Sequence, residues 1–186
     1  TRPEQILQTF PQAVQVLLDP ADCGPVCISL CQDIQGEIFD YPEDFFKEKI
    51  HNIRRPRPDD YQIKQAADLI KKSKNPIIIS GGGIFYSDAM KELSQFAKKH
   101  NIPTAQTVMG YSTMKKDDPY FLGAIGGFGG KAPNDFMKKT DLAIAIGTKL
   151  ADFTTGSWTN FENPNFKLVS FNVSIFDANK HMAKSI

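Results

Sequence analysis

The sequence predicts an α/β fold, in which a Rossmann-like parallel sheet carries helices on both faces. From residue 59 onward, short apolar runs such as "PIIIS" alternate with segments of helical periodicity. This alternation is typical of βαβ units, whose strands pair in parallel. Hydrophobic residues make up 41% and charged residues 23% of the chain, which excludes the disordered and fibrous classes.

The first 50 residues hold too few elements to close a core. Ile6, Leu7, Phe10, Val14 and Leu17 have helical spacing, and Pro11 would break or kink that helix. The segment "GPVCISLCQ" predicts a buried strand. One helix and one strand do not form an independent domain.

Three cysteines, Cys23, Cys27 and Cys31, are spaced four residues apart. This spacing raises the possibility of a metal or iron–sulfur site. Because no histidine or fourth cysteine lies nearby to complete a ligand set, we expect reduced thiols packed as small apolar side chains.

A domain boundary is expected at residues 51–58. The stretch "HNIRRPRPDD" combines charge with two prolines and has no apolar periodicity, which indicates an extended linker. The regular domain then covers residues 59–186.

Within this domain, "DDYQIKQAADLIKKSK" predicts a helix that Asp59 or Asp60 caps. A second helix, "SDAMKELSQFAKKH", would have Ser87 as its cap. The glycine-dense segment at 123–130 predicts a flexible loop, a short helix ends at "DFMKKT", and "DANKHMAKSI" predicts a terminal helix. The four strands are expected in "PIIIS", "IPTAQTVM", "DLAIAIGTKL" and "NFKLVSFNVS".

The formal net charge is +1 with mixed signs, which argues against a nucleic-acid surface. No apolar run approaches the ~20 residues of a membrane span, and no leader opens the chain. We therefore expect a soluble, cytoplasmic protein with neither nucleic acid nor membrane as a partner. Because it starts at Thr1 and stops inside a predicted helix, we expect a fragment of a longer protein.

Candidate site residues follow the predicted strands, since ligands of open parallel sheets bind beyond the carboxyl ends of the strands. The triplet Gly81, Gly82 and Gly83 forms either a cofactor-binding loop or a tight strand-to-helix turn. It does not fit the G-x-G-x-x-G fingerprint, and no Gly-Lys-Ser/Thr of a Walker loop occurs. The other candidates at these strand ends are Thr107, Gly110, Gly126, Gly147, Asp152 and Asn172.

No catalytic or metal-ligating set is expected in this chain. His51, His100 and His181 occur outside any nucleophile motif, so we expect surface residues. Asp152 is either a site residue or a structural cap. Trp158, Phe153 and Phe161 are expected in a core or an interface.

The ordered motifs of residues 75–156 resemble a known family. They comprise a GGG turn, "T-x-MG", "LG-x-x-G", a "DL-x-x-x-x-G" strand and "D-x-x-TG". This series resembles the central domain of thiamine-diphosphate-dependent enzymes of the acetohydroxyacid synthase type. "GPVCISLCQDIQGE" is similar to the closing strand of the preceding pyrimidine-binding domain, so residues 1–50 would be the C-terminal part of that domain.

Within the family, "RPEQILQTFPQAVQVLLDPADCGPV", "RRPRP" and "FNVSIFDANKH" resemble the hydrolases of myo-inositol breakdown. The resemblance implies that the full-length enzyme opens a cyclic 1,2-dione by C–C cleavage, with thiamine diphosphate and magnesium, as a homodimer or homotetramer. The "GDG…NN" stretch that holds the diphosphate is missing, and the activating glutamate lies upstream. The chain alone would therefore not be catalytic.

The resemblance also implies FAD or ADP as a possible ligand, because central domains of the family bind FAD, ADP or nothing. Such a nucleotide would contact Gly81 to Gly83, Thr107, Gly110, Gly126, Gly147 and Asp152. Asn172 and Ser174 stand where some relatives carry acidic residues that grip a ribose or adenine, which argues against tight dinucleotide binding. The competing hypothesis is a free-standing nucleotide-binding or structural module.

Overall fold

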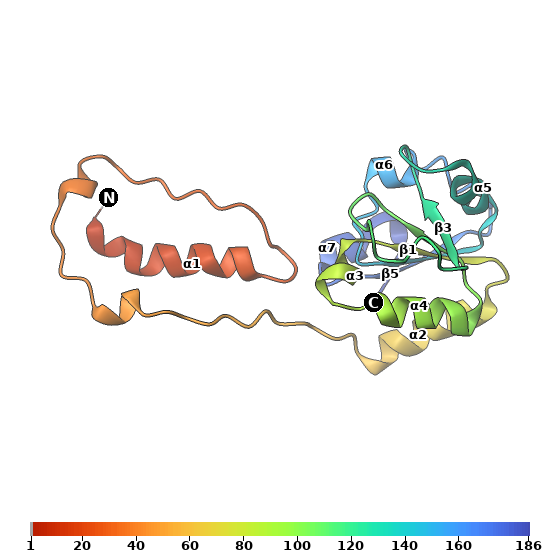
Figure 1. The fold of residues 1–186 in the computed structure, drawn as a ribbon, viewed down its shortest axis with the longest axis horizontal. Coiled ribbons are helices and arrows are strands. Elements are labelled where there is room, and N and C mark those ends of the chain that lie inside the picture. The colour runs from red at the N-terminus through yellow and green to blue at the C-terminus, as the bar shows by residue number, and fades with distance from the viewer. Residues whose placement is uncertain (1) are drawn as a thin grey trace. The chain divides into compact units, whose positions relative to one another are not determined.

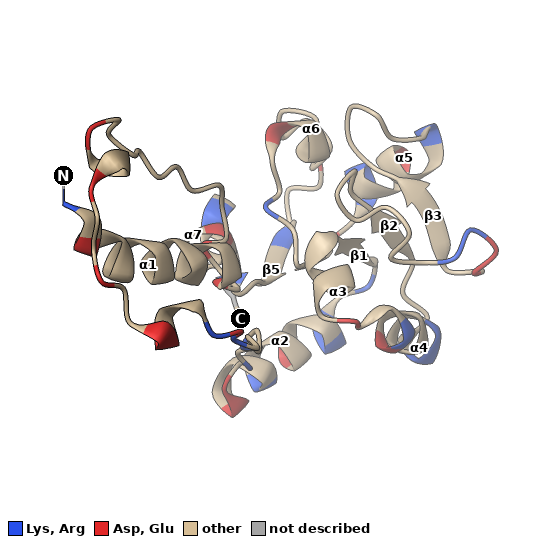
Figure 2. Cartoon of the chain, turned by 60° about the vertical axis from the view of Figure 1, so that its left-hand side comes forward, with Lys and Arg blue, Asp and Glu red and all other residues tan. Residues whose placement is uncertain are grey.

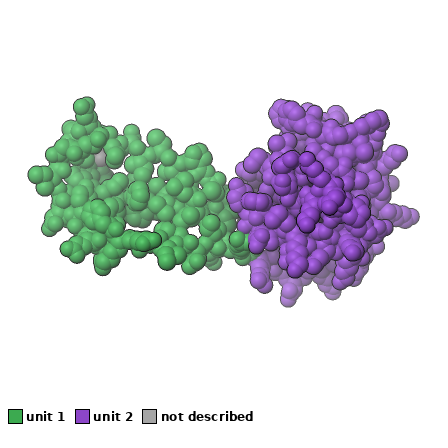
Figure 3. All heavy atoms as spheres, in the orientation of Figure 1, with its two compact units in different colours: residues 1–56 green, residues 57–186 purple. Residues whose placement is uncertain are grey.

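The chain forms two compact units, which Figure 3 colours separately. The structure is a computed structural model that describes residues 2–186. Unit 1 is Thr1–Pro56 and unit 2 is Arg57–Ile186, and the division falls within the stretch expected as a linker.

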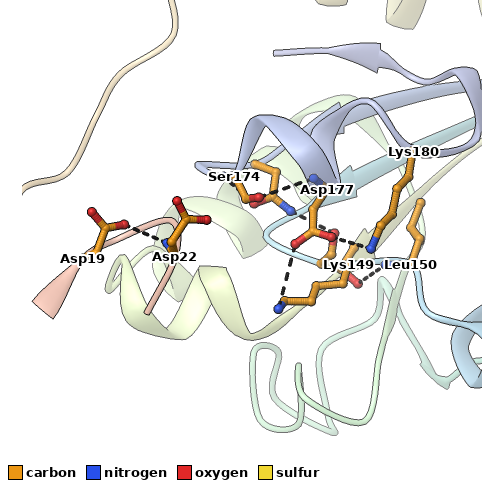
Figure 4. Close-up of polar contacts among 9 residues, drawn as sticks. Asp19, Asp22, Lys149, Leu150, Ser174, Asp177 and Lys180 are labelled. Carbon is orange, nitrogen blue, oxygen red and sulfur yellow. Dashed lines mark hydrogen bonds and ion pairs between the residues drawn. The ribbon is translucent and has the colours of Figure 1, made fainter. Parts of the chain in front are cut away.

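Over residues 2–56, unit 1 contains one α-helix. A 3₁₀ turn at Pro3–Gln5 leads into α1, Ile6–Leu18, which continues through Pro11 although proline has no N–H to donate. After α1, Asp19 Oδ1 accepts the N–H groups of Ala21 and Asp22, both at 2.7 Å. Figure 4 shows the bond to Asp22. Further 3₁₀ turns lie at Ile34–Gly36 and Glu43–Phe46.

Aromatic side chains supply much of the packing in unit 1. The Tyr41 ring lies 4.9 Å from Phe39 and 6.2 Å from both Phe45 and Phe46, between ring centroids. In the part of unit 1 that the structure describes, Ala13 is the only buried hydrophobic residue. Unit 1 therefore lacks a hydrophobic core of its own.

The prediction of a buried strand in "GPVCISLCQ" is wrong. Residues 23–31 form no strand, and Cys23, Cys27 and Cys31 are exposed free thiols. A strand needs a neighbour to pair its backbone N–H and C=O groups. Residues 2–56 contain no strand, so the segment has no strand to pair with and stays outside any sheet.

Unit 2 is built on a six-stranded parallel sheet, which confirms the predicted fold class (Figure 1). The strand order is β3-β2-β1-β4-β5-β6, the order of a doubly wound Rossmann sheet. The topological switch point lies between β1 and β4, where ligands of such sheets bind. The strands are β1 Pro76–Ser80, β2 Thr104–Gln106, β3 Phe121–Ala124, β4 Leu142–Ile146, β5 Lys167–Phe171 and β6 Lys184–Ser185.

Helices cover both faces of this sheet. On one face, α2 (Asp60–Lys72) and α4 (Met90–His100) run side by side, and α5 (Lys131–Lys139) packs on the other (Figure 1). Alternate strand residues enter the two cores, because successive side chains of a strand point to opposite faces. The shorter helices are α3 Gly82–Tyr86, α6 Asp152–Thr155 and α7 Ile175–Ala178, with a 3₁₀ turn at Lys180–Met182.

Asp59 caps α2, as one of the two sequence alternatives predicted. Its Oδ1 accepts the Gln62 N–H at 2.7 Å, and the Gln62 side chain accepts the Asp59 N–H at 3.2 Å. This reciprocal capping box satisfies two backbone groups at the start of the helix.

The expected cap of the next helix is wrong. Ser87 ends α3, where its N–H donates to the Gly83 carbonyl at 3.0 Å. Helix α4 begins after Ala89 without a side-chain cap. The sequence pattern missed α3, which starts directly on the glycine triplet, and placed the start of α4 at Ser87 instead of Met90.

Two further expectations are wrong because they overlooked edge strands. Residues 123 and 124 of the expected loop belong to β3, whereas residues 125–130 lie outside any helix or strand. The Thr104 N–H donates to the Tyr120 carbonyl at 2.7 Å and helps join β3 to β2. Where the terminal helix was expected, the last residues form β6 instead. The Ile186 N–H donates to the Ser170 carbonyl oxygen at 2.8 Å. Both strands depend on a neighbour distant in sequence, which local periodicity does not reveal.

Among residues 2–186, none of the helices has the length and apolar character needed to cross a bilayer. In the view of Figure 2, α2 and α4 each carry both basic and acidic residues. This mixture agrees with the net charge of +1.

Asp141 joins two segments at the amino edge of the sheet. Its carboxylate accepts a hydrogen bond from the Ser73 hydroxyl and the N–H groups of Lys74 (2.7 Å) and Asn75 (3.0 Å). Burial raises the pKa of this carboxyl, but these hydrogen bonds outweigh burial and leave the pKa below 3.8. Asp141 thereby anchors the loop between α2 and β1 to the start of β4.

We expect Asp59→Ala to lower the free energy of unfolding by about 1 kcal/mol, because the N–H of Gln62 loses its acceptor. Urea denaturation followed by circular dichroism measures the change. The matched control is Asp60→Ala, which removes a carboxylate from the first turn but leaves the capping box intact. Equal losses in the two variants would contradict the assigned cap.

Asp141 makes stability pH-dependent at acid pH. Because its folded pKa lies below the unfolded value of 3.8, its contribution is complete above 3.8 and is lost as the pH falls through the folded pKa. We expect Asp141→Asn to lower the free energy of unfolding by about 1 kcal/mol at pH 7. In this variant the free energy of unfolding should also decrease less steeply as the pH falls below 3.8. Asp68→Asn, at an exposed position of α2, is the control and should retain the steeper decrease.

Candidate functional site

The glycine triplet after β1 contacts the end of β4 backbone to backbone. The Gly81 N–H donates to Ile146 O and the Gly83 N–H to Gly147 O, both at 2.9 Å. A Cβ atom on Gly83 would lie 2.5 Å from the Cα of Gly147, so the approach requires glycine. Two N–H groups that a phosphate would need at this turn are therefore already bound within the protein.

Hydroxyl groups hold the loop after β2 against β1. Thr107 Oγ1 accepts the Gly110 N–H at 3.0 Å, and Thr113 Oγ1 donates to the Gly110 carbonyl at 2.7 Å. Ser80 Oγ lies 2.7 Å from Thr113 Oγ1, with both side chains buried. Thr107 and Gly110 were predicted at this edge, whereas Ser80 and Thr113 were missed because isolated hydroxyl residues form no motif.

Gly126 contacts a different part of the edge, the helix α6. The neighbouring Gly127 N–H donates to the Phe153 carbonyl at 2.7 Å. The side chain of Asn134 accepts the Gly126 N–H at 2.9 Å and donates to its carbonyl at 3.1 Å. Asp152, the first residue of α6, is exposed.

Asn172 binds the loop after β4. Its Nδ2 donates to Thr148 O and its Oδ1 accepts the Ser174 N–H, both at 3.0 Å. Both ends of the Asn172 side-chain amide are therefore bound to protein groups. This is the position where some relatives were expected to contact a ribose or adenine.

A buried carboxylate reinforces the same junction. Asp177 Oδ1 lies 2.5 Å from Lys180 Nζ and its Oδ2 lies 3.9 Å from Lys149 Nζ, while Ser174 caps the helix by accepting the Asp177 N–H at 3.3 Å (Figure 4). Sequence analysis missed this cluster, because Lys149 and Asp177 are brought together only by the pairing of β4 with β5.

Trp158 packs in a cluster that joins residues far apart in sequence. Its ring stacks on His181 at 4.2 Å between centroids and lies 4.5 Å from Phe161. His181 is exposed, as predicted, and its Nε2 lies 3.2 Å from the Leu150 carbonyl oxygen. Phe153 was expected in a core or an interface, but within this chain the residue is 65% exposed.

An open hollow of about 380 Å³ lies at the amino edge of the sheet, away from these candidates. Its lining includes Lys72, Asp141 and Phe166. Since ligands of parallel sheets bind at the carboxyl edge, we attach no chemistry to this hollow. In the part of the chain that the structure describes, no three His, Cys, Asp or Glu side chains gather as metal ligands.

The sheet order and the glycine-rich strand ends agree with the comparison to protein families. Residues 63–186 match the family model described as "Thiamine pyrophosphate enzyme, central domain". The chain belongs to this family. The match covers most of unit 2, so the predicted family and the observed Rossmann-like architecture agree.

Curated relatives match nearly the whole chain. A 3D-(3,5/4)-trihydroxycyclohexane-1,2-dione hydrolase of Clostridium botulinum is 48% identical over 96% of this chain. The hydrolases of Clostridium perfringens (strain 13 / Type A) and Bacillus thuringiensis (strain Al Hakam) are 45% and 44% identical over 100% and 96% of the chain. The chain spans only 28–29% of the length of these relatives.

We expect Gly83→Ala to destabilise unit 2 by about 2 kcal/mol or more, because its Cβ would force the backbone away from Gly147. The shift in the urea midpoint measures the effect. Gly127→Ala is the control, since its Cβ would make only an ordinary contact, at 3.5 Å from Phe153 Cδ1. A Gly83→Ala protein as stable as the control would contradict the tight backbone contact.

Proposed function

We propose that the chain is the central domain, with part of the preceding domain, of a thiamine-diphosphate-dependent hydrolase. The reaction is the opening of 3,5/4-trihydroxycyclohexane-1,2-dione by C–C cleavage. The observation that carries this proposal is the 44–48% identity, over at least 96% of the chain, to relatives of that name. Since the chain spans less than a third of those relatives, the activity is proposed for a longer protein.

Residues 1–50 are proposed as the C-terminal part of the pyrimidine-binding domain, followed by a linker at 51–58 and the central domain at 59–186. The relatives match unit 1 as well as unit 2, whereas the family model starts at residue 63. The missing core of unit 1 supports this division, because one helix and an unpaired extended segment need further structure to pack against.

The described residues do not fit the cofactor of the family. The chain lacks the diphosphate-binding "GDG…NN" stretch, and no cluster of carboxylates among residues 2–186 can hold magnesium. We propose that thiamine diphosphate and magnesium bind to other parts of a cytoplasmic homodimer or homotetramer. The chain by itself is then not catalytic.

We also infer that the carboxyl edge at Gly81–Gly83 serves as a structural turn in this chain. FAD or ADP would have to replace the Gly83–Gly147 hydrogen bond, and the Asn172 amide is occupied by Thr148 and Ser174. The remaining candidates, Thr107, Gly110 and Gly126, likewise contact protein groups.

The activity is tested with the reading frame that contains this chain, expressed and purified whole. We expect ring opening of the dione, followed by mass spectrometry, to require added thiamine diphosphate and magnesium. The separate 186-residue chain is the control and should show no turnover. A full-length protein that leaves the dione intact with both cofactors present would overturn the proposed activity.

Nucleotide binding is tested by thermal denaturation of the 186-residue chain with FAD or ADP. A ligand that binds only the folded state raises the melting temperature, so we expect no concentration-dependent rise. A clear rise that saturates with FAD or ADP would show that the edge opens to a nucleotide.

A further inference from the structure

Two exposed aromatic rings stack at the carboxyl edge of the sheet. The rings of Phe128 and Phe153 lie 5.4 Å apart between centroids, with 19° between their planes. The two residues remain 72% and 65% exposed. Two adjacent exposed phenylalanines form a small apolar surface that a ligand can cover.

The backbone holds this pair in place. Gly127, beside Phe128, donates its N–H to the Phe153 carbonyl at 2.7 Å. Gly126 has a left-handed φ of +83° and is bound on both backbone groups by the Asn134 amide. The two rings therefore belong to segments that are fixed to each other, and binding would not have to order them.

An exposed carboxylate lies next to this pair in the chain. Asp152 precedes Phe153 and is the first residue of α6. Within residues 2–186, its carboxylate forms no hydrogen bond or ion pair, so both oxygens are available to donors outside this chain. Apolar rings beside a few polar groups are typical of small-molecule sites.

We propose that Phe128, Phe153 and Asp152 form a subsite for a cyclic polyol. In a hydroxylated cyclohexane, the hydroxyls project from the rim and C–H groups occupy the faces. One such face would pack on the phenylalanine pair, while the carboxylate would accept hydrogen bonds from adjacent hydroxyls. The inference rests on the proposed function, because the relatives' trihydroxycyclohexane-dione belongs to this chemical class.

The position and shape of the pair favour this ligand class. The pair lies after β3 and β4, on the edge where parallel sheets bind ligands. Phe85 and Tyr86 on α3 are also exposed, but their rings meet at 83° with centroids 6.5 Å apart. They do not stack in parallel, so they supply a control at the same edge.

The test is a titration of the ¹⁵N-labelled 186-residue chain with myo-inositol, a stable cyclohexane polyol, followed by NMR. We expect saturable shifts of the amides at 126–128 and 152–154, weaker with the linear polyol sorbitol. Phe128→Ala/Phe153→Ala should weaken binding about tenfold, and Asp152→Asn should weaken it severalfold. The control Phe85→Ala should bind as the parent chain does.

Shifts that are absent, equal with sorbitol, or unchanged in the double variant would overturn the subsite. The replaced rings are exposed, so the variants should stay folded. The NMR spectrum of each variant shows whether it does. Binding in this chain does not require turnover. If the chain does not bind the polyol but the full-length protein opens the ring, only this inference is refuted. If the chain binds the polyol but the full-length protein leaves the dione intact, only the proposed activity is refuted.

Discussion

The hydrogen bond from Gly83 to Gly147 joins the two central strands of unit 2 beyond their carboxyl ends. At 2.9 Å, with no room for a Cβ on either residue, it brings the start of α3 against the end of β4. Gly147 has a left-handed φ of +60°, which glycine adopts at low cost. The turn after β1 and the turn after β4 can therefore share the switch point of the sheet.

The neighbouring segments extend this closed junction. Thr107, Thr113 and Ser80 hold the loop after β2, and Asn172 joins the turn after β5 to the loop after β4. Protein groups thus occupy many of the backbone sites that a phosphate would use. Around Phe128 and Phe153, the same edge is apolar and exposed. One part of the edge is therefore bound up in hydrogen bonds within the protein, and another part is exposed to solvent.

Unit 1 shows how strongly strand formation depends on partners. Its segment "GPVCISLCQ" has the apolar content of a buried strand, yet it remains extended and its cysteines are exposed. Hydrophobic content favours burial only where a second apolar surface is available. The longer relatives match unit 1 together with unit 2, and the chain spans 28–29% of their length.

The sequence by itself determined the fold class, the central strands β1, β4 and β5, the Asp59 cap and the family. These depend on local periodicity, side-chain capping and ordered motifs, all of which are readable along the chain. Only the tertiary structure decided the edge strands β3 and β6, the short helix α3, and the Asp177 cluster. It also placed Phe128 beside Phe153. Each of these requires contacts between residues distant in sequence, and a linear pattern contains no record of which strands become neighbours.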